Sequence, residues 1–386
     1  MIDEESIKQN LNDFAFPRLS GTIHEKKALD LAFKKLLALG LKPNIQNFDF
    51  STFYSRTYPK IAFLFGFLLL VSFYIDLRVG LFISLILGPI LVFLVIIMKK
   101  PENVKFPRNF ESANLFVKLK VRRDLSKKVS YNQRKRIVFS CHLDSKGQKL
   151  SILARIRSMR TWIFSSVIII IILGFKYLVQ SNFVIFFIII GGILIILNFI
   201  STILVLINTT NNSSLGAIDN ATGITCVLEL LKYYLSEDNR IDNIEYWFVF
   251  TGCEETGTMG IRNLYKKIKF FERDSLMLVN FDAIGGNITI FDSIFQPEGY
   301  LEFYNSFLNN KVGIEIREES KRINFGTHSD GYYLKKRNFQ GIEFGDMEAY
   351  QFLHSKEDTI DKVNTRNLKK LCELIVENLR LYYKNM

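Results

Sequence analysis

The sequence has few cysteines and lacks repeats, nucleic-acid-binding motifs and a signal peptide, which excludes several classes of protein. Its four cysteines are far apart and form no CxxC pair, which excludes a disulfide framework and is typical of small buried residues in a reducing compartment. No internal repeat, low-complexity tract or nucleic-acid-binding motif is present, so no nucleic-acid partner is expected despite the net charge of +12. Residues 1–14 lack the basic start and apolar core of a cleavable signal peptide, which predicts a cytoplasmic N-terminus.

Long apolar runs are abundant. Residues 61–98 are broken only by Asp76 and Arg78, and a second pair of runs covers 162–179 and 183–207. Each run is close to the ~20 residues that cross a bilayer. Buried core helices are the alternative, but these runs have no polar face to turn towards water. The sequence therefore predicts four transmembrane helices in two hairpins.

The distribution of basic residues predicts the orientation in the membrane. Two hairpins leave all soluble pieces on one side, where most of the flanking lysines and arginines lie, while the short far-side turns hold only Arg78 and Lys176. By the positive-inside bias we expect an integral membrane protein whose soluble domain is cytoplasmic. The spans carry almost no ionisable residues, which disfavours a transporter.

The remaining sequence alternates between helical and strand patterns. We expect strands at 44–53, 113–121, 136–143, 244–252, 275–285, 313–320 and 340–346, and helices at 24–43, 222–237, 260–271, 301–310, 331–339 and 364–385. Such alternation predicts an α/β sandwich with a mixed central sheet. The predicted organisation is one domain, made of 1–58, 100–158 and 209–386, with hairpins inserted at 59–99 and 159–208.

Five separated segments hold residues that suit a two-metal hydrolase. The segments are RIVFSCHLDSKGQ, GAIDNATG, FVFTGCEETG, LVNFDAIGG and FLHSKEDTID, and their candidate residues are His142, Asp144, Asp219, Glu254, Glu255, Asp282 and His354. Several follow strand-like runs, so they are expected to meet where parallel strands end. Paired metals need imidazoles and carboxylates, one of them shared, and a further carboxylate that takes a proton from water. Adjacent Glu254 and Glu255 can divide the roles of base and ligand, and Asp144 can orient the imidazole of His142.

Together these motifs closely resemble the M28 family of zinc peptidases, a superfamily that includes aminopeptidases and glutaminyl cyclases. The resemblance covers essentially the whole soluble part and implies a three-layer sandwich of the zinc exopeptidase type. It implies that His142 and Asp282 bind one zinc ion, that Glu255 and His354 bind the other, and that Asp219 bridges them. Glu254 would then be the general base and Asp144 the partner of the first histidine. Cobalt or manganese are alternative metals for such ligands.

Two departures from the family pattern stand out. Many members carry a tyrosine before the last histidine, where this chain has Leu353, so Tyr350 or Tyr332 is expected to take its place. The inserted hairpins are the second departure. Because the second hairpin separates His142 from Asp219, we hypothesise a membrane-associated peptide substrate; simple tethering of an enzyme for soluble peptides is the alternative.

The predicted function is a membrane-integrated di-zinc exopeptidase, and an aminopeptidase above all. A glutaminyl cyclase is an alternative, because HLDSK is similar to the cyclase form of the first motif and that branch uses one zinc ion. A catalytically inactive membrane scaffold of the same fold is a further alternative. It is disfavoured because every expected ligand is present together with Glu254.

Overall fold

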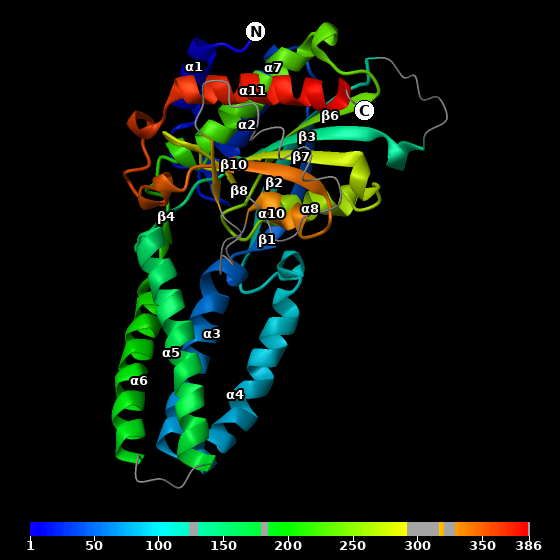
Figure 1. Ribbon diagram of the computed structural model, residues 1–386. Helices are drawn as coiled ribbons and strands as arrows, with labels where there is room; N and C mark the ends of the chain where they lie inside the picture. The colour runs from blue at the N-terminus through cyan, green and yellow to red at the C-terminus, as the bar shows by residue number, and fades with distance from the viewer. Residues whose placement is uncertain (123–129, 179–183, 292–315, 320–328, 385–386) are drawn as a thin grey trace. The chain divides into compact units, whose positions relative to one another are not determined.

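A computed structural model describes residues 1–122, 130–178, 184–291, 316–319 and 329–384. The chain divides into two compact units (Figure 1). The first, which we call the sheet unit, consists of Met1–Asp49, Phe110–Gly147 and Asn211–Met386. The second, which we call the helical unit, consists of Phe50–Asn109 and Gln148–Thr210.

An eight-stranded sheet forms the centre of the sheet unit, in the order β1-β2-β6-β3-β7-β10-β8-β9. The four central strands, β6, β3, β7 and β10, run parallel to one another. On either side of them, β2 pairs antiparallel with β6, and β8 pairs antiparallel with β10. The prediction of a mixed sheet is thus confirmed. The strands are β1 (Asn44–Ser51), β2 (Asn109–Leu119), β3 (Lys135–His142), β6 (Ile244–Thr251), β7 (Leu276–Phe281), β8 (Ile288–Phe291), β9 (Ile316–Glu319) and β10 (Gln340–Gly345), and a separate small pair is β4 (Gly147–Gln148) with β5 (Thr210–Asn211).

Helices cover both faces of this sheet, which confirms the three-layer sandwich. Alternate residues of a strand point to opposite faces. Accordingly Ile137 and Phe139 pack in one apolar cluster, while Val138 between them packs in the other. Helices α1, α2, α7 and α11 cover the first face and α8 and α10 the second (Figure 1). Their bounds are α1 (Glu4–Phe14), α2 (Ile23–Ala38), α7 (Thr222–Leu235), α8 (Met259–Ile268), α10 (Asp330–Lys335) and α11 (Thr365–Lys384).

Helix α1, strand β8 and the two-residue strands β4 and β5 were not predicted from the sequence. Helix α1 buries Ile7, Leu11 and Phe14 at helical spacing, and the Asp3 side chain caps its start by accepting a hydrogen bond from the backbone of Glu5. Strand β8 has only four residues, too few for its alternation to stand out. The helix expected at 301–310 lies outside the described residues.

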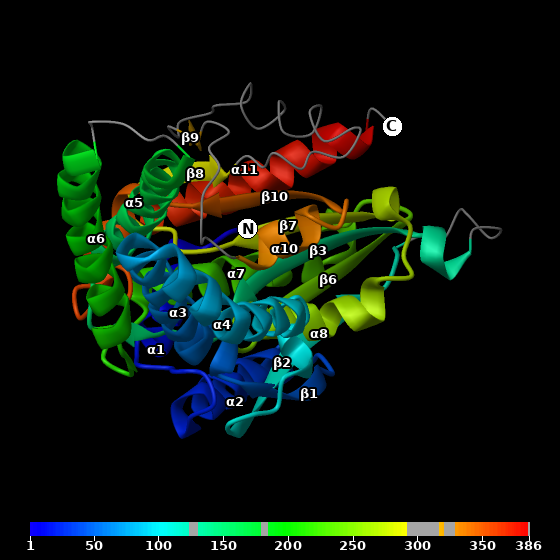
Figure 2. The ribbon, with the colours of Figure 1, turned by 90° about the horizontal axis from the view of Figure 1, so that it is seen from below.

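Among its described residues, the helical unit has four helices that are long and apolar enough to cross a membrane, by length and composition. They form two hairpins, with α3 beside α4 and α5 beside α6 (Figure 2). Between α3 and α4 the carboxylate of Asp76 accepts hydrogen bonds from the backbone of Arg78 and Val79, which starts the second helix. The bounds are α3 (Tyr58–Ile75), α4 (Leu77–Met98), α5 (Ile152–Leu178) and α6 (Val184–Ile207).

Candidate metal centre

Three of the candidate segments meet at one edge of the sheet because they follow neighbouring parallel strands. His142 is the last residue of β3 and lies opposite Thr251, the last residue of β6. The Glu254–Glu255 pair follows β6, and Asp282 follows directly after β7, on the other side of β3. Open α/β sheets build their sites at this edge.

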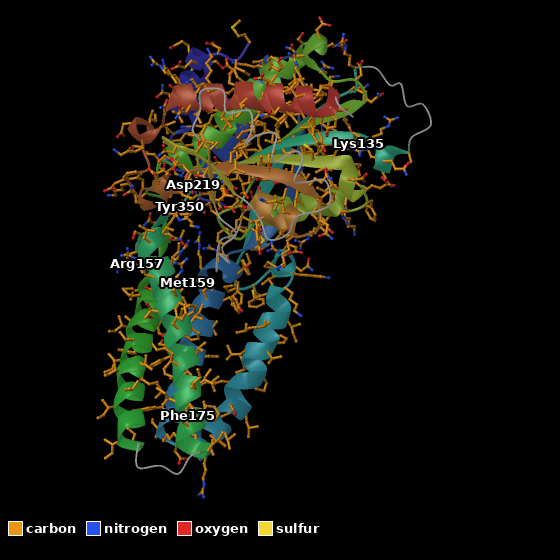
Figure 3. All side chains as sticks on the ribbon, in the orientation of Figure 1. Lys135, Arg157, Met159, Phe175, Asp219 and Tyr350 are labelled. Atoms are coloured by element: carbon orange, nitrogen blue, oxygen red, sulfur yellow. The ribbon has the colours of Figure 1, made fainter. Side chains whose placement is uncertain are left out.

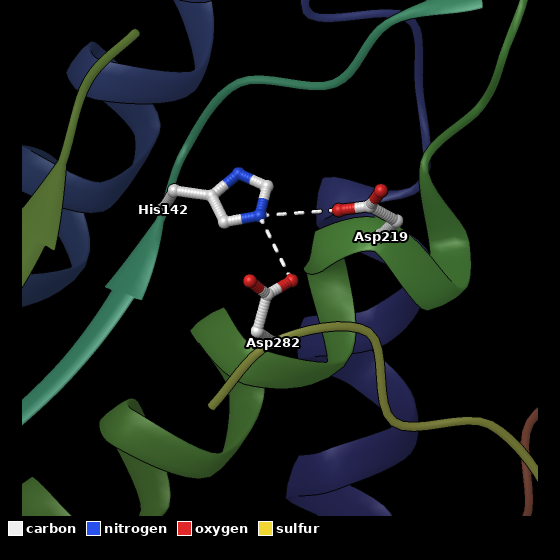
Figure 4. Close-up of side chains that lie close together, drawn as sticks. All are labelled: His142, Asp219 and Asp282. Atoms are coloured by element: carbon white, nitrogen blue, oxygen red, sulfur yellow. Dashed lines mark ion pairs between the residues drawn. The ribbon is translucent and has the colours of Figure 1, made fainter. Parts of the chain in front are cut away.

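The sheet edge, the turn before α7 and the loop after β10 together supply two groups of side chains. In the first group, His142 Nε2 lies 3.1 Å from Asp219 Oδ1 and 3.5 Å from Asp282 Oδ1 (Figure 4). In the second, His354 Nε2 lies 3.2 Å from Asp219 Oδ2 and 3.0 Å from Glu255 Oε1. Asp219 therefore belongs to both groups, one carboxylate oxygen in each. Figure 3 shows where Asp219 lies in the sheet unit.

The atoms of these groups have the properties expected of metal ligands. Within the described chain, His142 Nε2, Asp219 Oδ1 and Glu255 Oε1 are buried and have no hydrogen-bond partner. Buried carboxylates are costly unless they are paired or coordinate a metal. Mixed imidazole nitrogen and carboxylate oxygen donors suit zinc. Each group could thus hold one divalent ion, and the residues present fit a pair of ions that shares Asp219.

Electrostatics within the cluster also favour cations. Burial raises the pKa of Glu254 well above its usual range, and the neighbouring carboxylates of Asp282 and Glu255 raise it further. Burial likewise raises the pKa of Asp282 to about 6. Burial would raise the pKa of Asp219 too, but the neighbouring imidazoles of His142 and His354 hold it below its ordinary value. A cation bound among these carboxylates would offset the repulsion between them.

Asp144 connects the first histidine to the Glu254–Glu255 loop. Its buried carboxylate accepts hydrogen bonds from the backbone N–H groups of Glu254 at 2.9 Å and Glu255 at 3.0 Å, and from the Ser20 hydroxyl at 2.6 Å. The Nδ1 atom of His142 lies 2.9 Å from the backbone oxygen of Asp144 and 3.5 Å from its carboxylate. The carboxylate thus holds the acidic loop, and the nearest contact to the imidazole is the main chain of the same residue.

Sequence reasoning missed Arg18, which ties together the loops around the site. Its guanidinium is fully buried and donates to five backbone carbonyls in three separate parts of the chain. The acceptors are Leu143 at 2.8 Å, Phe16 at 2.8 Å, Leu215 at 3.0 Å, Gly216 at 2.9 Å, and Phe14. Arg18 lies in the polar segment FPRLSGT between two helices, where neither periodicity nor spacing marks a buried residue.

Two further polar residues hold individual ligands. The Asp358 carboxylate accepts hydrogen bonds from the backbone of Ile218 at 2.6 Å and of Asp219 at 3.4 Å, which fixes the turn that carries the shared carboxylate. The Nζ atom of Lys146 lies 2.7 Å from Glu255 Oε2. Glu255 therefore directs one oxygen to the lysine and the other to His354. Lys146 belongs to the HLDSK segment of the sequence, but its contact with Glu255, 109 positions away, could not be predicted from that segment.

Tyr350 and Tyr332, the two tyrosines expected to stand in for the one that Leu353 replaces, both lie in the sheet unit. Leu353 is buried, at 3% exposure, and packs away from water. Tyr350, labelled in Figure 3, stacks on Phe291 with ring centroids 6.5 Å apart. Tyr332 lies in the first turn of α10. All four cysteines are free and buried.

Comparison with known proteins agrees with this fold. Residues 199–379 match Peptidase family M28. A search of curated proteins found no significant match. An aminopeptidase from Aneurinibacillus sp. strain AM-1 superimposes with a TM-score of 0.56 at 12% identity, over 98% of this chain and 93% of that one.

Two other solved structures show the same fold. A zinc aminopeptidase from Bacillus subtilis gives a TM-score of 0.55 at 12% identity, over 98% of this chain and 95% of that one. A glutaminyl cyclase from Fimbriiglobus ruber gives 0.54 at 12% identity, over 97% and 94%. At such identities the likeness shows the fold alone, and the family match covers the segments of Asp219, Glu255, Asp282 and His354. Residues 199–379 are thus similar to Peptidase family M28, and the chain as a whole has the fold of these zinc aminopeptidase and glutaminyl cyclase structures.

Proposed function

We propose that the chain is a di-zinc aminopeptidase anchored in a membrane. The observation that supports it most is the sharing of Asp219 between two groups that each offer three ligand atoms. His142, Asp282 and Asp219 would hold one ion, and Glu255, His354 and Asp219 the other. The zinc aminopeptidase of the same fold favours zinc over cobalt or manganese, although the donor set accepts all three.

Glu254 is the proposed general base. Its side chain is buried beside Glu255, and burial raises its pKa above the usual range of a carboxyl, which strengthens it as a base. When bound, paired zinc ions supply an activated water and stabilise developing negative charge on a carbonyl oxygen. Glu254 would accept the proton from that water and return it to the departing amine. Asp144 supports this role because it holds the backbone of Glu254 in place.

The helical unit is the proposed membrane anchor. Its four apolar helices have the length and composition of membrane spans, and the lysines and arginines beside them favour a cytoplasmic sheet unit. An enzyme held in this way would meet membrane-associated peptides at high local concentration. We therefore propose peptides at the membrane surface as its substrates.

Glutaminyl cyclisation is the second candidate. The cyclase of Fimbriiglobus ruber shares the fold, and the segment HLDSK, which contains Lys146, is similar to the cyclase form of the first motif. The Lys146–Glu255 contact lies in the second group only, so the first group remains available to a metal. A cyclase needs only one zinc ion, so the presence of two complete groups favours the aminopeptidase.

The test is to incubate purified, zinc-loaded protein with a peptide library that includes N-terminal glutamine, and to analyse the products by mass spectrometry. The proposal predicts free amino acids from the N-terminal end. Glu254→Gln should abolish their release, while Glu237→Gln, at an exposed surface position, should not change it. Conversion of N-terminal glutamine to pyroglutamate without release of amino acids would instead establish the cyclase.

A further inference from the structure

A cavity in the helical unit combines charge with apolar walls. It has a volume of about 310 Å³ and lies between α5 and α6. Its lining consists of two arginines, two hydroxyl residues and four apolar residues: Arg157, Arg160, Thr161, Ser165, Phe164, Ile168, Leu194 and Leu197. Neither arginine makes a hydrogen bond or an ion pair within the described residues, and both are exposed. Two unpaired guanidinium groups beside an apolar cavity indicate an anionic, amphipathic ligand.

The order of these residues along α5 matches the profile of a membrane leaflet. Figure 3 shows Arg157 and Phe175 near opposite ends of this helix. At about 1.5 Å per residue, Ile168 lies about 12 Å deeper along the axis than Arg160. The arginines therefore stand at headgroup level when the helix spans a bilayer, and the apolar wall stands at the level of the acyl chains.

A network of polar side chains joins the two helices that line the cavity. Asn198 of α6 donates hydrogen bonds to the Ser165 and Ser166 hydroxyls, both at 2.9 Å, and to the backbone oxygen of Trp162 at 3.1 Å. The Trp162 indole in turn donates to Thr202 at 3.1 Å. Such hydrogen bonds between helices fix their relative position inside a membrane. The cavity is thus a built feature of the hairpin, since Ser165 also lines it.

We propose that this cavity is a binding site for an anionic phospholipid. The phosphate pairs with Arg157 and Arg160, and an acyl chain lies against Phe164, Ile168 and the two leucines of α6. Basic pockets between membrane helices bind anionic headgroups in this way. The inference rests on the proposed membrane insertion and is independent of the peptidase reaction.

Trp162 provides a direct test because it lies within one turn of both Arg160 and Phe164. The chain has two tryptophans, and Trp247→Phe removes the other, which is buried in the sheet. This variant is placed in phosphatidylcholine vesicles that contain a minority of brominated phosphatidylglycerol or, in parallel, brominated phosphatidylcholine. Bromine quenches a nearby indole, so quenching measures which lipid occupies the site.

We expect stronger quenching by the anionic lipid. Adding Arg157→Gln and Arg160→Gln should reduce the preference by up to about 30-fold, at about 1 kcal/mol per arginine. Lys99→Gln with Lys100→Gln removes equal charge after α4, outside the cavity, and should leave the preference unchanged. Equal quenching by both lipids, or equal loss in the two double variants, would overturn the site. No quenching by either lipid would overturn membrane insertion as well.

Discussion

Replacing Arg18 with lysine tests the anchoring of the loops that carry the metal ligands. The guanidinium serves five backbone carbonyls at full burial, whereas a lysine ammonium has three donors. At least two carbonyls would therefore lose their partner. Hydrogen bonds from a charged group are worth about 1.5–3 kcal/mol each, so the free energy of unfolding should fall by about 3–6 kcal/mol.

Thermal unfolding of the detergent-purified protein, followed by circular dichroism, measures this loss. A domain of this size loses about 2–4 °C of midpoint per kcal/mol, so Arg18→Lys should lower the midpoint by at least about 6 °C. Arg122→Lys is the matched control, because Arg122 pairs at the surface with Asp238, which is 90% exposed. Such a pair contributes no more than about 1 kcal/mol. A midpoint for Arg18→Lys equal to that of the control would refute the anchoring role.

Three further predictions concern the metal centre and the helical unit. Lys146→Met should increase the affinity of the second group for its metal ion, because it removes a positive charge 2.7 Å from Glu255. Competition with a chromophoric chelator measures this affinity, and an unchanged value would contradict the prediction. Zinc affinity should rise between about pH 5 and 8, because zinc displaces protons from His142, whose pKa is raised, and from Asp282, whose pKa is about 6. Calorimetry in buffers of different ionisation enthalpy should detect the released protons, and a pH-independent affinity would count against it. Asn198→Leu should lower the stability of the helical unit by about 0.6–2 kcal/mol in a detergent unfolding titration, whereas a more stable variant would show that the network is dispensable.

The sequence was most informative where physical periodicity is strong. The apolar runs and the strand before His142 could be predicted because burial imposes a pattern on consecutive residues. The strand ends then placed His142, Glu254 and Asp282 at one edge of the sheet, which needs only the rule for open α/β sheets. Helix α1 was not predicted because its three buried apolar residues stand among polar ones.

The supporting residues of the site could not be predicted, because their contacts join distant parts of the chain. Arg18 reaches Leu215 and Gly216 across almost 200 positions, and Asp358 reaches Asp219 across 139. No local pattern specifies such a pair. Asp144 was predicted to orient His142. Its carboxylate also accepts hydrogen bonds from the backbone of Glu254 and Glu255, which the sequence did not predict.

Metal stoichiometry tests the central claim, the sharing of Asp219 by two ions, most directly. Elemental analysis of the zinc-loaded protein should give two ions per chain for the wild type. His142→Gln should retain one ion, because the group of Asp219, Glu255 and His354 is intact, and Asp219→Asn should lose both. One ion in the wild type, or two ions retained in Asp219→Asn, would contradict the account.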